Sequence, residues 1–189
     1  MEESQVTKLV LIGGSAGSLE VLMQLLPELA FGLDFPIVIV LHRKNSDDTT
    51  LEELIAMKTV LPVREIEDKT VMQKGSVYIV PSDYHLLFEN DASLSLDTSE
   101  KVNYSRPSID VVFESAAVVF RESAVAILLS GSNADGASGC RLIKENNGKV
   151  ILQNPKTADM GFMPNSALQL VTPDFILESS EIASVINEL

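Results

Sequence analysis

Three residues with the functional groups of nucleophilic catalysis lie at the ends of apolar, strand-like runs. Ser15, His42 and Asp135 each follow such a run directly or lie in the loop after it. Ligands of open α/β sheets bind beyond the carboxyl ends of the strands, so we expect these side chains at one edge of a sheet. A hydroxyl nucleophile, an imidazole base and a carboxylate that orients the base can together perform acyl transfer. The sequence thus provides a candidate Ser-His-Asp site.

The local sequence around Ser15 is typical of a nucleophile on a sharp turn. Gly13-Gly14-Ser15-Ala16-Gly17 fits G-x-S-x-G and lies between a predicted strand and a predicted helix. Small neighbours expose the hydroxyl, and backbone N–H groups at the helix start can stabilise an oxyanion. The alternative is a glycine-rich phosphate loop or a simple tight turn. No G-x-G-x-x-G in register and no G-K-[ST] is present, so a nucleotide site is less favoured.

The base and the carboxylate also have alternatives. The chain has two histidines, His42 and His85, and both follow apolar runs. The pattern does not choose firmly between them, although His42 ends the clearer core strand, and a lone histidine is more often structural than catalytic. Asp135 lies among small residues that allow a carboxylate to approach an imidazole, but such an aspartate can equally cap a helix.

Composition restricts the class of protein. The net charge is −13 and no cluster of Lys and Arg occurs, which argues against a nucleic-acid partner. Cys140 is the only cysteine, so we expect no disulfide and a reducing compartment. No apolar run approaches the roughly 20 residues that span a bilayer, and the N-terminus is acidic, unlike a signal peptide. We expect a cytoplasmic protein without membrane insertion, metal or cofactor.

The order of apolar runs predicts a single domain over residues 1–189. Buried strands alternate with amphipathic helices, which indicates an α/β fold: a doubly wound, mostly parallel sheet with flanking helices and a small antiparallel β-insert. Core strands are expected at 6–12, 36–41, 124–129 and 150–152. Short strands at 62–66, 77–80, 85–88 and 94–96 are expected to form this antiparallel insert or an edge, with a turn between the last two at Asn90-Asp91.

Helices are predicted from the 3.6-residue spacing of apolar side chains. One begins at Ser18 with Leu19 on its apolar face, and another spans 49–57 with Asp47 and Asp48 near its start. A third begins at 105–108 with Pro107 in its first turn. Its inner face is expected to hold Ile109, Val112, Phe113, Ala116, Ala117 and Phe120. Further helices are predicted at 137–145, at 164–170 and at the end of the chain.

Taken in order, the motifs resemble the catalytic domain of the CheB family of chemotaxis methylesterases over nearly the whole chain. Each motif alone is modest, but the ordered set is specific. The matching segments are Ile12-Gly-Gly-Ser-Ala-Gly-Ser18, Val40-Leu-His42, Gly75-Ser-Val-Tyr-Ile-Val-Pro81 with His85, Arg106-Pro-Ser-Ile-Asp110, Leu129-Ser-Gly-Ser-Asn-Ala-Asp-Gly-Ala137 and Met163-Pro164.

This resemblance implies hydrolysis of glutamate γ-methyl esters on the cytoplasmic helices of methylated chemoreceptors, with release of methanol. Some members of the family also deamidate receptor glutamines. The resemblance implies Ser15 as nucleophile, His42 as base and Asp135 as the third member, without a cofactor, and leaves His85 at the site rim or in a structural role. It gives no oligomeric state.

The sequence also departs from the family pattern. Ala16-Gly17-Ser18 replaces T-G-G, Ser132-Asn133 replaces M-G, and Phe162 replaces the glycine of G-M-P. No receiver domain is expected, so control would come from a partner or from expression. The altered loops leave a catalytically degenerate binding module in a signalling complex as the main alternative, followed by a nucleotide- or phosphate-binding domain.

Overall fold

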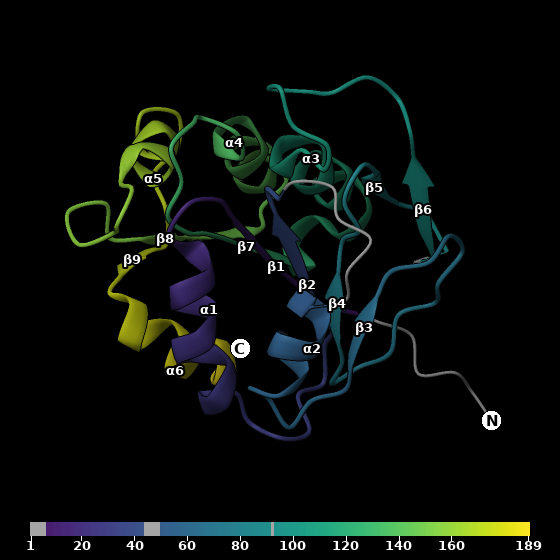
Figure 1. Ribbon diagram of the computed structural model, residues 1–189. Coiled ribbons are helices and arrows are strands. Elements are labelled where there is room, and N and C mark those ends of the chain that lie inside the picture. Colours follow the sequence, from purple (N-terminus) through teal and green to yellow (C-terminus); the bar gives the residue numbers. More distant parts are fainter. Residues whose placement is uncertain (1–6, 44–49, 92) are drawn as a thin grey trace.

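A seven-stranded parallel sheet forms the centre of the computed structural model, which describes residues 7–43, 50–91 and 93–189 (Figure 1). The strand order is β3-β4-β2-β1-β7-β8-β9, and every neighbouring pair is parallel. The strands of this sheet are β1 (Leu9–Gly14), β2 (Ile37–Leu41), β3 (Val63–Glu65), β4 (Val77–Ile79), β7 (Ala124–Leu128), β8 (Lys149–Gln153) and β9 (Phe175–Leu177). The predicted α/β class with a mostly parallel sheet is confirmed.

Helices cover both faces of the sheet. They are α1 (Ser18–Leu25), α2 (Thr50–Ala56), α3 (Ile109–Phe120), α4 (Ala137–Glu145), α5 (Phe162–Leu168) and α6 (Ile182–Asn187), with 3-10 turns at Leu26–Glu28, Arg121–Ser123 and Ser179–Glu181. One core lies under α3, α4 and α5 and the other under α1, α2 and α6. In β1, Leu9 and Leu11 enter the first core and Val10 and Ile12 the second, so the strand is buried on both faces. None of the helices in the described ranges is long and apolar enough to cross a membrane.

The antiparallel insert is smaller than the sequence suggested. Strands β5 (His85–Phe88) and β6 (Leu94–Asp97) form the predicted antiparallel pair, with the turn at Asn90-Asp91. Strands β3 and β4, predicted in an antiparallel insert or edge, pair in parallel within the main sheet, with β3 at its edge. The reason is burial: the three residues of β4 are all buried, which suits a strand between two others.

The start of α3 also differs from its prediction. The helix begins at Ile109, and the buried Ser108 caps it by accepting a hydrogen bond from the Val111 N–H. Pro107 therefore precedes the cap and lies outside the first turn. The six predicted inner-face residues are all buried, because their spacing follows the helical repeat.

Other boundaries deviate by a few residues. Leu19 on α1 is exposed, with Val21 buried instead. α5 begins two residues before the predicted start, and β9 at the sheet edge was not predicted. The predicted positions 6, 47, 48 and 49 lie outside the described residues.

Candidate active site

Ser15 lies in the turn between β1 and α1, at the carboxyl end of the sheet. Its N–H donates to the Ser130 carbonyl at 2.9 Å, and its carbonyl accepts hydrogen bonds from the backbone N–H and the hydroxyl of Ser18. Gly17 has a φ of +81°, and a Cβ there would lie 2.7 Å from the Ser130 hydroxyl oxygen. Only glycine therefore fits this tight turn. The Ala16 N–H donates to no residue that the structure describes and remains available to a substrate oxygen.

The parallel pairing of β1 with β2 ends one residue before Ser15 and His42. The register pairs Gly14 with Leu41, and the His42 N–H donates to the Gly14 carbonyl at 3.1 Å. Extending this register by one residue aligns Ser15 with His42, across a spacing of about 4.8 Å between neighbouring strands. No hydrogen bond to the Ser15 hydroxyl is present within the described part of the chain. Catalytic hydrogen bonds are often long before substrate binds.

The imidazole of His42 contacts the carboxylate of Asp135 directly. Nε2 lies 2.6 Å from Oδ2 of Asp135, and the histidine side chain is only 11% exposed. A carboxylate accepts hydrogen bonds, so Nε2 carries the proton of the neutral ring and Nδ1 is the nitrogen left to act as a base. The Nδ2 of Asn133 lies 3.5 Å from this Nδ1.

Asp135 is completely buried and surrounded by hydrogen-bond donors. Burial by itself raises its pKa, but hydrogen bonds from His42, Asn103 and the N–H groups of Ile109 and Asp110 outweigh it and hold the Asp135 pKa below its ordinary value. The hydroxyl of Ser108 also donates to Oδ1, at 2.8 Å. The start of α3 therefore fixes the carboxylate in its ionised form.

Asn103 is a member of this network that the sequence did not single out. Its Nδ2 donates to Asp135 Oδ1 at 2.7 Å and to Asp110 Oδ2 at 2.8 Å, although the residue is exposed. Burial, followed by the negative charge of Asp135, raises the Asp110 pKa. Asn103 thus separates two carboxylates that would otherwise face each other. Asn103 has a φ of +52°, a conformation that asparagine tolerates better than most residues. The residue type was therefore the one signal in the sequence, but asparagine is too common in loops for that signal to identify it.

Replacing Asn103 by aspartate should destabilise the network. A third carboxylate would face Asp135 and Asp110, so we expect the free energy of unfolding to fall by about 2 kcal/mol near pH 7, with a parallel loss of activity. Urea denaturation measures the change. Asn90→Asp adds the same charge at an exposed hairpin turn and should leave stability within about 0.5 kcal/mol. Equal effects of the two substitutions would contradict the bridging role.

His85 belongs to the framework of the site. It is buried, its Nδ1 accepts from the Ser108 N–H at 3.1 Å, and its Nε2 donates to the Glu100 carbonyl at 2.9 Å. Both ring nitrogens are therefore occupied, and neither contacts Ser15. Of the two histidines that the sequence left open, the geometry favours His42 as the base.

Residues 7–43, 50–91 and 93–189 contain no group of three or more His, Cys, Asp and Glu side chains arranged to hold a metal ion. Cys140 is buried, which raises its pKa and leaves the thiol protonated.

Comparison with known proteins identifies the family of the chain. The sequence model described as CheB methylesterase matches residues 10–186. A protein of Leptospira interrogans, provisionally named a protein-glutamate methylesterase/protein-glutamine glutaminase, is 38% identical over 180 residues, which are 95% of this chain and 93% of that protein. The protein-glutamate methylesterase/protein-glutamine glutaminase of Thermotoga maritima is 31% identical over 96% of this chain, which spans about half (54%) of that protein.

The fold agrees as well. The crystal structure of the Thermotoga maritima CheB methylesterase catalytic domain superposes with a TM-score of 0.91 at 31% identity, covering 96% of this chain and 97% of that domain. The chain therefore belongs to the CheB methylesterase family.

Proposed function

We propose that the protein is a protein-glutamate O-methylesterase that hydrolyses glutamate γ-methyl esters on the cytoplasmic helices of methylated chemoreceptors. Hydrolysis of receptor glutamine amides by the same site is a second activity of the proposal. The observation that carries it is the contact of His42 Nε2 with the buried Asp135 carboxylate at 2.6 Å, with Ser15 and His42 each one residue beyond the paired ends of β1 and β2. The names of the relatives support the choice of substrate.

The reaction proceeds in two steps on these residues. His42 Nδ1 takes the proton of Ser15 Oγ while the oxygen attacks the ester carbonyl, and it returns that proton to the methoxide that leaves as methanol. Water then gives a proton to the same nitrogen and attacks the acyl-enzyme; as the acyl bond breaks, that proton passes to Ser15 Oγ, which releases glutamate and restores both residues. The Ala16 N–H stabilises the negative oxygen in both steps, a contribution of about 3 kcal/mol per donor in such sites.

Methanol release from a methyl-esterified chemoreceptor tests the proposal. We expect methanol to form in proportion to enzyme and the receptor to shift to its unesterified form, as followed by mass spectrometry. Unesterified receptor serves as the control for methanol from other sources. A folded protein that releases no methanol would overturn the esterase.

A histidine base predicts a dependence of activity on pH. The imidazole must be neutral to accept the serine proton, and imidazoles take up a proton between about pH 5 and 8. We therefore expect kcat/KM to fall on acidification, as the base becomes protonated. Activity that does not fall on acidification while the protein stays folded would argue against a histidine base.

One contact favours a second candidate function, a binding module that keeps the fold without turnover. The Asn133 amide faces the Nδ1 that must receive the serine proton, where the family pattern has a glycine. A serine-directed phosphonate discriminates between the two candidates, because it labels only an activated serine. Labelling of Ser15 supports the esterase, whereas an unreactive Ser15 supports the binding module.

A further inference from the structure

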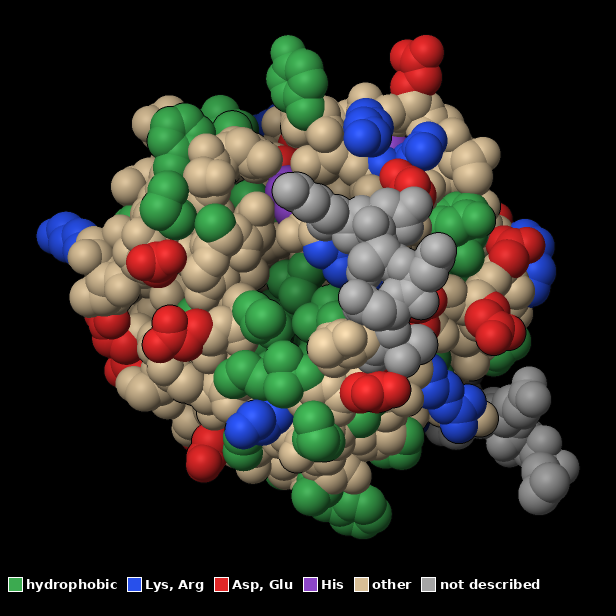
Figure 2. All heavy atoms as spheres, viewed as in Figure 1, with side chains coloured by type: hydrophobic (Ala, Val, Ile, Leu, Met, Phe, Trp, Pro, Cys, Tyr) green, Lys and Arg blue, Asp and Glu red, His purple; other side chains and the backbone are tan. Residues whose placement is uncertain are grey.

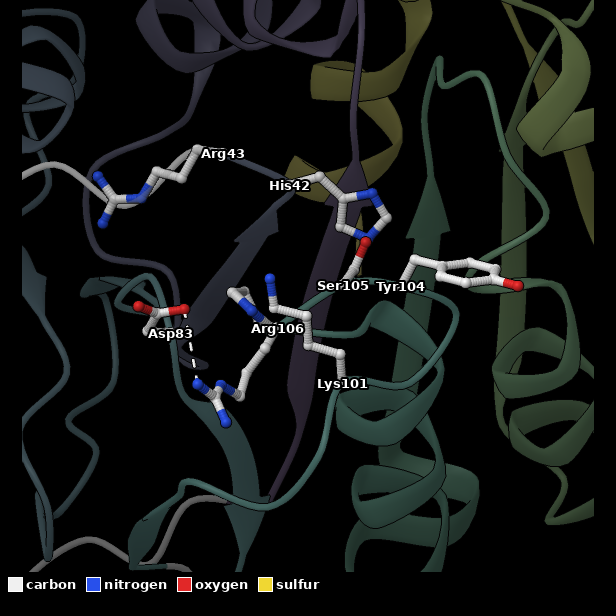
Figure 3. Close-up of a pocket in the computed structure, with 8 residues that line it drawn as sticks. His42, Arg43, Asp83, Lys101, Tyr104, Ser105 and Arg106 are labelled. Carbon is white, nitrogen blue, oxygen red and sulfur yellow. Dashed lines mark ion pairs between the residues drawn. The ribbon is translucent and has the colours of Figure 1, made fainter.

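A cavity of about 370 Å³ opens beside the candidate triad and shares His42 with it. Its lining includes three cationic side chains, Arg43, Lys101 and Arg106, and one carboxylate, Asp83 (Figure 3). The chain as a whole carries a net charge of −13. Figure 2 shows acidic side chains scattered over one face of the molecule, with several basic side chains close together at its upper right. Three of the four Lys, Arg, Asp and Glu side chains that line the cavity are therefore cationic.

The two arginines of the cavity are held by the protein itself. Arg43 Nη2 lies 2.9 Å from carboxylate oxygens of both Glu52 and Glu65. Arg106 Nη1 donates to two backbone carbonyls, those of Thr98 at 2.7 Å and Ser99 at 2.8 Å. These contacts fix the positions of both guanidinium groups before any ligand arrives, and the two carboxylates offset the charge of Arg43.

The positive charge of Arg106 and Lys101 is only partly neutralised. The Arg106 Nη2 lies 3.7 Å from Asp83, and the buried Nε of Arg106 has no hydrogen-bond partner within the described ranges. Lys101 is exposed and forms no hydrogen bond or ion pair with any residue that the structure describes. In Figure 3 its side chain extends toward Arg106, while the Tyr104 ring is turned to the other side. Lys101 therefore supplies a charge that is free to meet an anion.

We propose that this cavity is a subsite for a side-chain carboxylate of the substrate, an unesterified acidic residue near the ester in the same segment. This inference rests on the proposed esterase function and specifies its substrate. The cavity shares His42 with the triad, so a carboxylate held there and an ester at Ser15 lie within reach of one short peptide. Ammonium and guanidinium groups together are the donors that bind carboxylates.

The subsite overcomes a problem that the net charge creates. A protein of charge −13 repels an acidic segment over most of its surface, which slows encounter and favours neutral peptides. A positive cavity next to the nucleophile reverses that preference locally. It would also orient the segment, because the ester and the neighbouring acidic residue must then occupy their two positions at once.

Two peptides test the subsite. Both carry one glutamate γ-methyl ester; one has glutamates at the neighbouring positions and the other has glutamines there. We expect the unaltered protein to show a kcat/KM about fivefold higher for the acidic peptide, the upper range for one exposed ion pair. Lys101→Gln should abolish the preference and Lys101→Glu should invert it.

Lys149→Gln is the matched control. Lys149 is exposed at the amino end of β8, whereas the candidate triad lies at the carboxyl ends of the strands. This substitution removes the same charge and should leave the fivefold preference in place. Equal rates for the two peptides, or a preference that survives in Lys101→Gln, would overturn the subsite. If Lys149→Gln lost the preference for the acidic peptide as Lys101→Gln does, the subsite would also be overturned, since the effect would then come from net charge.

Binding of the two peptides to the Ser15→Ala protein separates the subsite from the esterase. Fluorescence anisotropy of labelled peptides requires no turnover, and we expect tighter binding of the acidic peptide, lost on adding Lys101→Gln. Tighter binding without any hydrolysis by the unaltered protein would support the subsite and overturn the esterase. Hydrolysis of both peptides with equal binding would support the esterase and overturn the subsite.

Discussion

Substitution of Ser15 by alanine should reduce ester hydrolysis by about a millionfold, because no other group then forms the acyl-enzyme. The fold should remain, since the described chain shows no hydrogen bond to the Ser15 hydroxyl and the backbone contacts of Ser15 to Ser130 and Ser18 do not need it. Methanol release measures the activity, and circular dichroism with thermal unfolding measures the fold.

Ser132→Ala is the matched control for the nucleophile. Ser132 is an exposed serine in the Asp135 loop, and its removal should leave hydrolysis within about threefold of the unaltered rate. Methanol release that persists in Ser15→Ala would mean that another residue is the nucleophile.

Replacing Asp135 by asparagine should lower kcat by about 10⁴-fold. The amide cannot hold the His42 Nε2–H as a carboxylate does, so the ring loses the tautomer that leaves Nδ1 free to accept a proton. Stopped-time methanol assays under saturating substrate give kcat directly. A kcat within tenfold of the unaltered protein would remove Asp135 from the mechanism.

The same substitution should destabilise the protein in a pH-dependent manner. The Asp135 pKa lies below its ordinary value, so the ionised carboxylate stabilises the fold above the ordinary aspartate range, and this stabilisation is lost as the pH falls through the lowered pKa. The difference in free energy of unfolding between Asp135→Asn and the unaltered protein should therefore be largest near pH 7, about 3 kcal/mol, and shrink on acidification. Urea denaturation at several pH values measures it.

Asp110→Asn is the control for the loss of a carboxylate charge beside Asp135. Asp110 shares the Asn103 hydrogen bonds with Asp135 but makes no contact with His42. Burial raises its pKa, so loss of its charge costs less than loss of the Asp135 charge. We expect kcat within about tenfold of the unaltered protein. An equal loss in both variants would assign the effect to the shared network rather than to the orientation of His42.

Sequence was most informative where burial leaves a continuous apolar run. Strands β1, β2 and β7 are buried on both faces, and their runs predicted the centre of the sheet. The same criterion assigned β4 to the wrong sheet, because three apolar residues do not reveal which strands flank them. β9 was missed because its residues are mostly exposed at the sheet edge, so no burial pattern marks it.

The members of the candidate site were easier to predict than their supports. Ser15 and His42 directly follow buried strands, and ligands of open α/β sheets bind beyond the carboxyl ends of the strands. Asn103 and Ser108 contact Asp135 from positions 32 and 27 residues away in sequence, through loop and helix-cap geometry that only the folded chain defines. Asn133 was noted as a departure from the family, but its position beside Nδ1 depends on the path of the loop.

The three candidate triad residues follow strands that are neighbours in the sheet in the order β2-β1-β7, yet His42 and Asp135 are 93 residues apart in the chain. No fragment that lacks one of these strands contains the complete set, so no early local structure can hydrolyse an ester. Long-range strand pairing is the slow part of folding. During refolding, ester hydrolysis should therefore recover later than the helical circular dichroism signal. The time at which hydrolysis returns then measures when β7 pairs with β1.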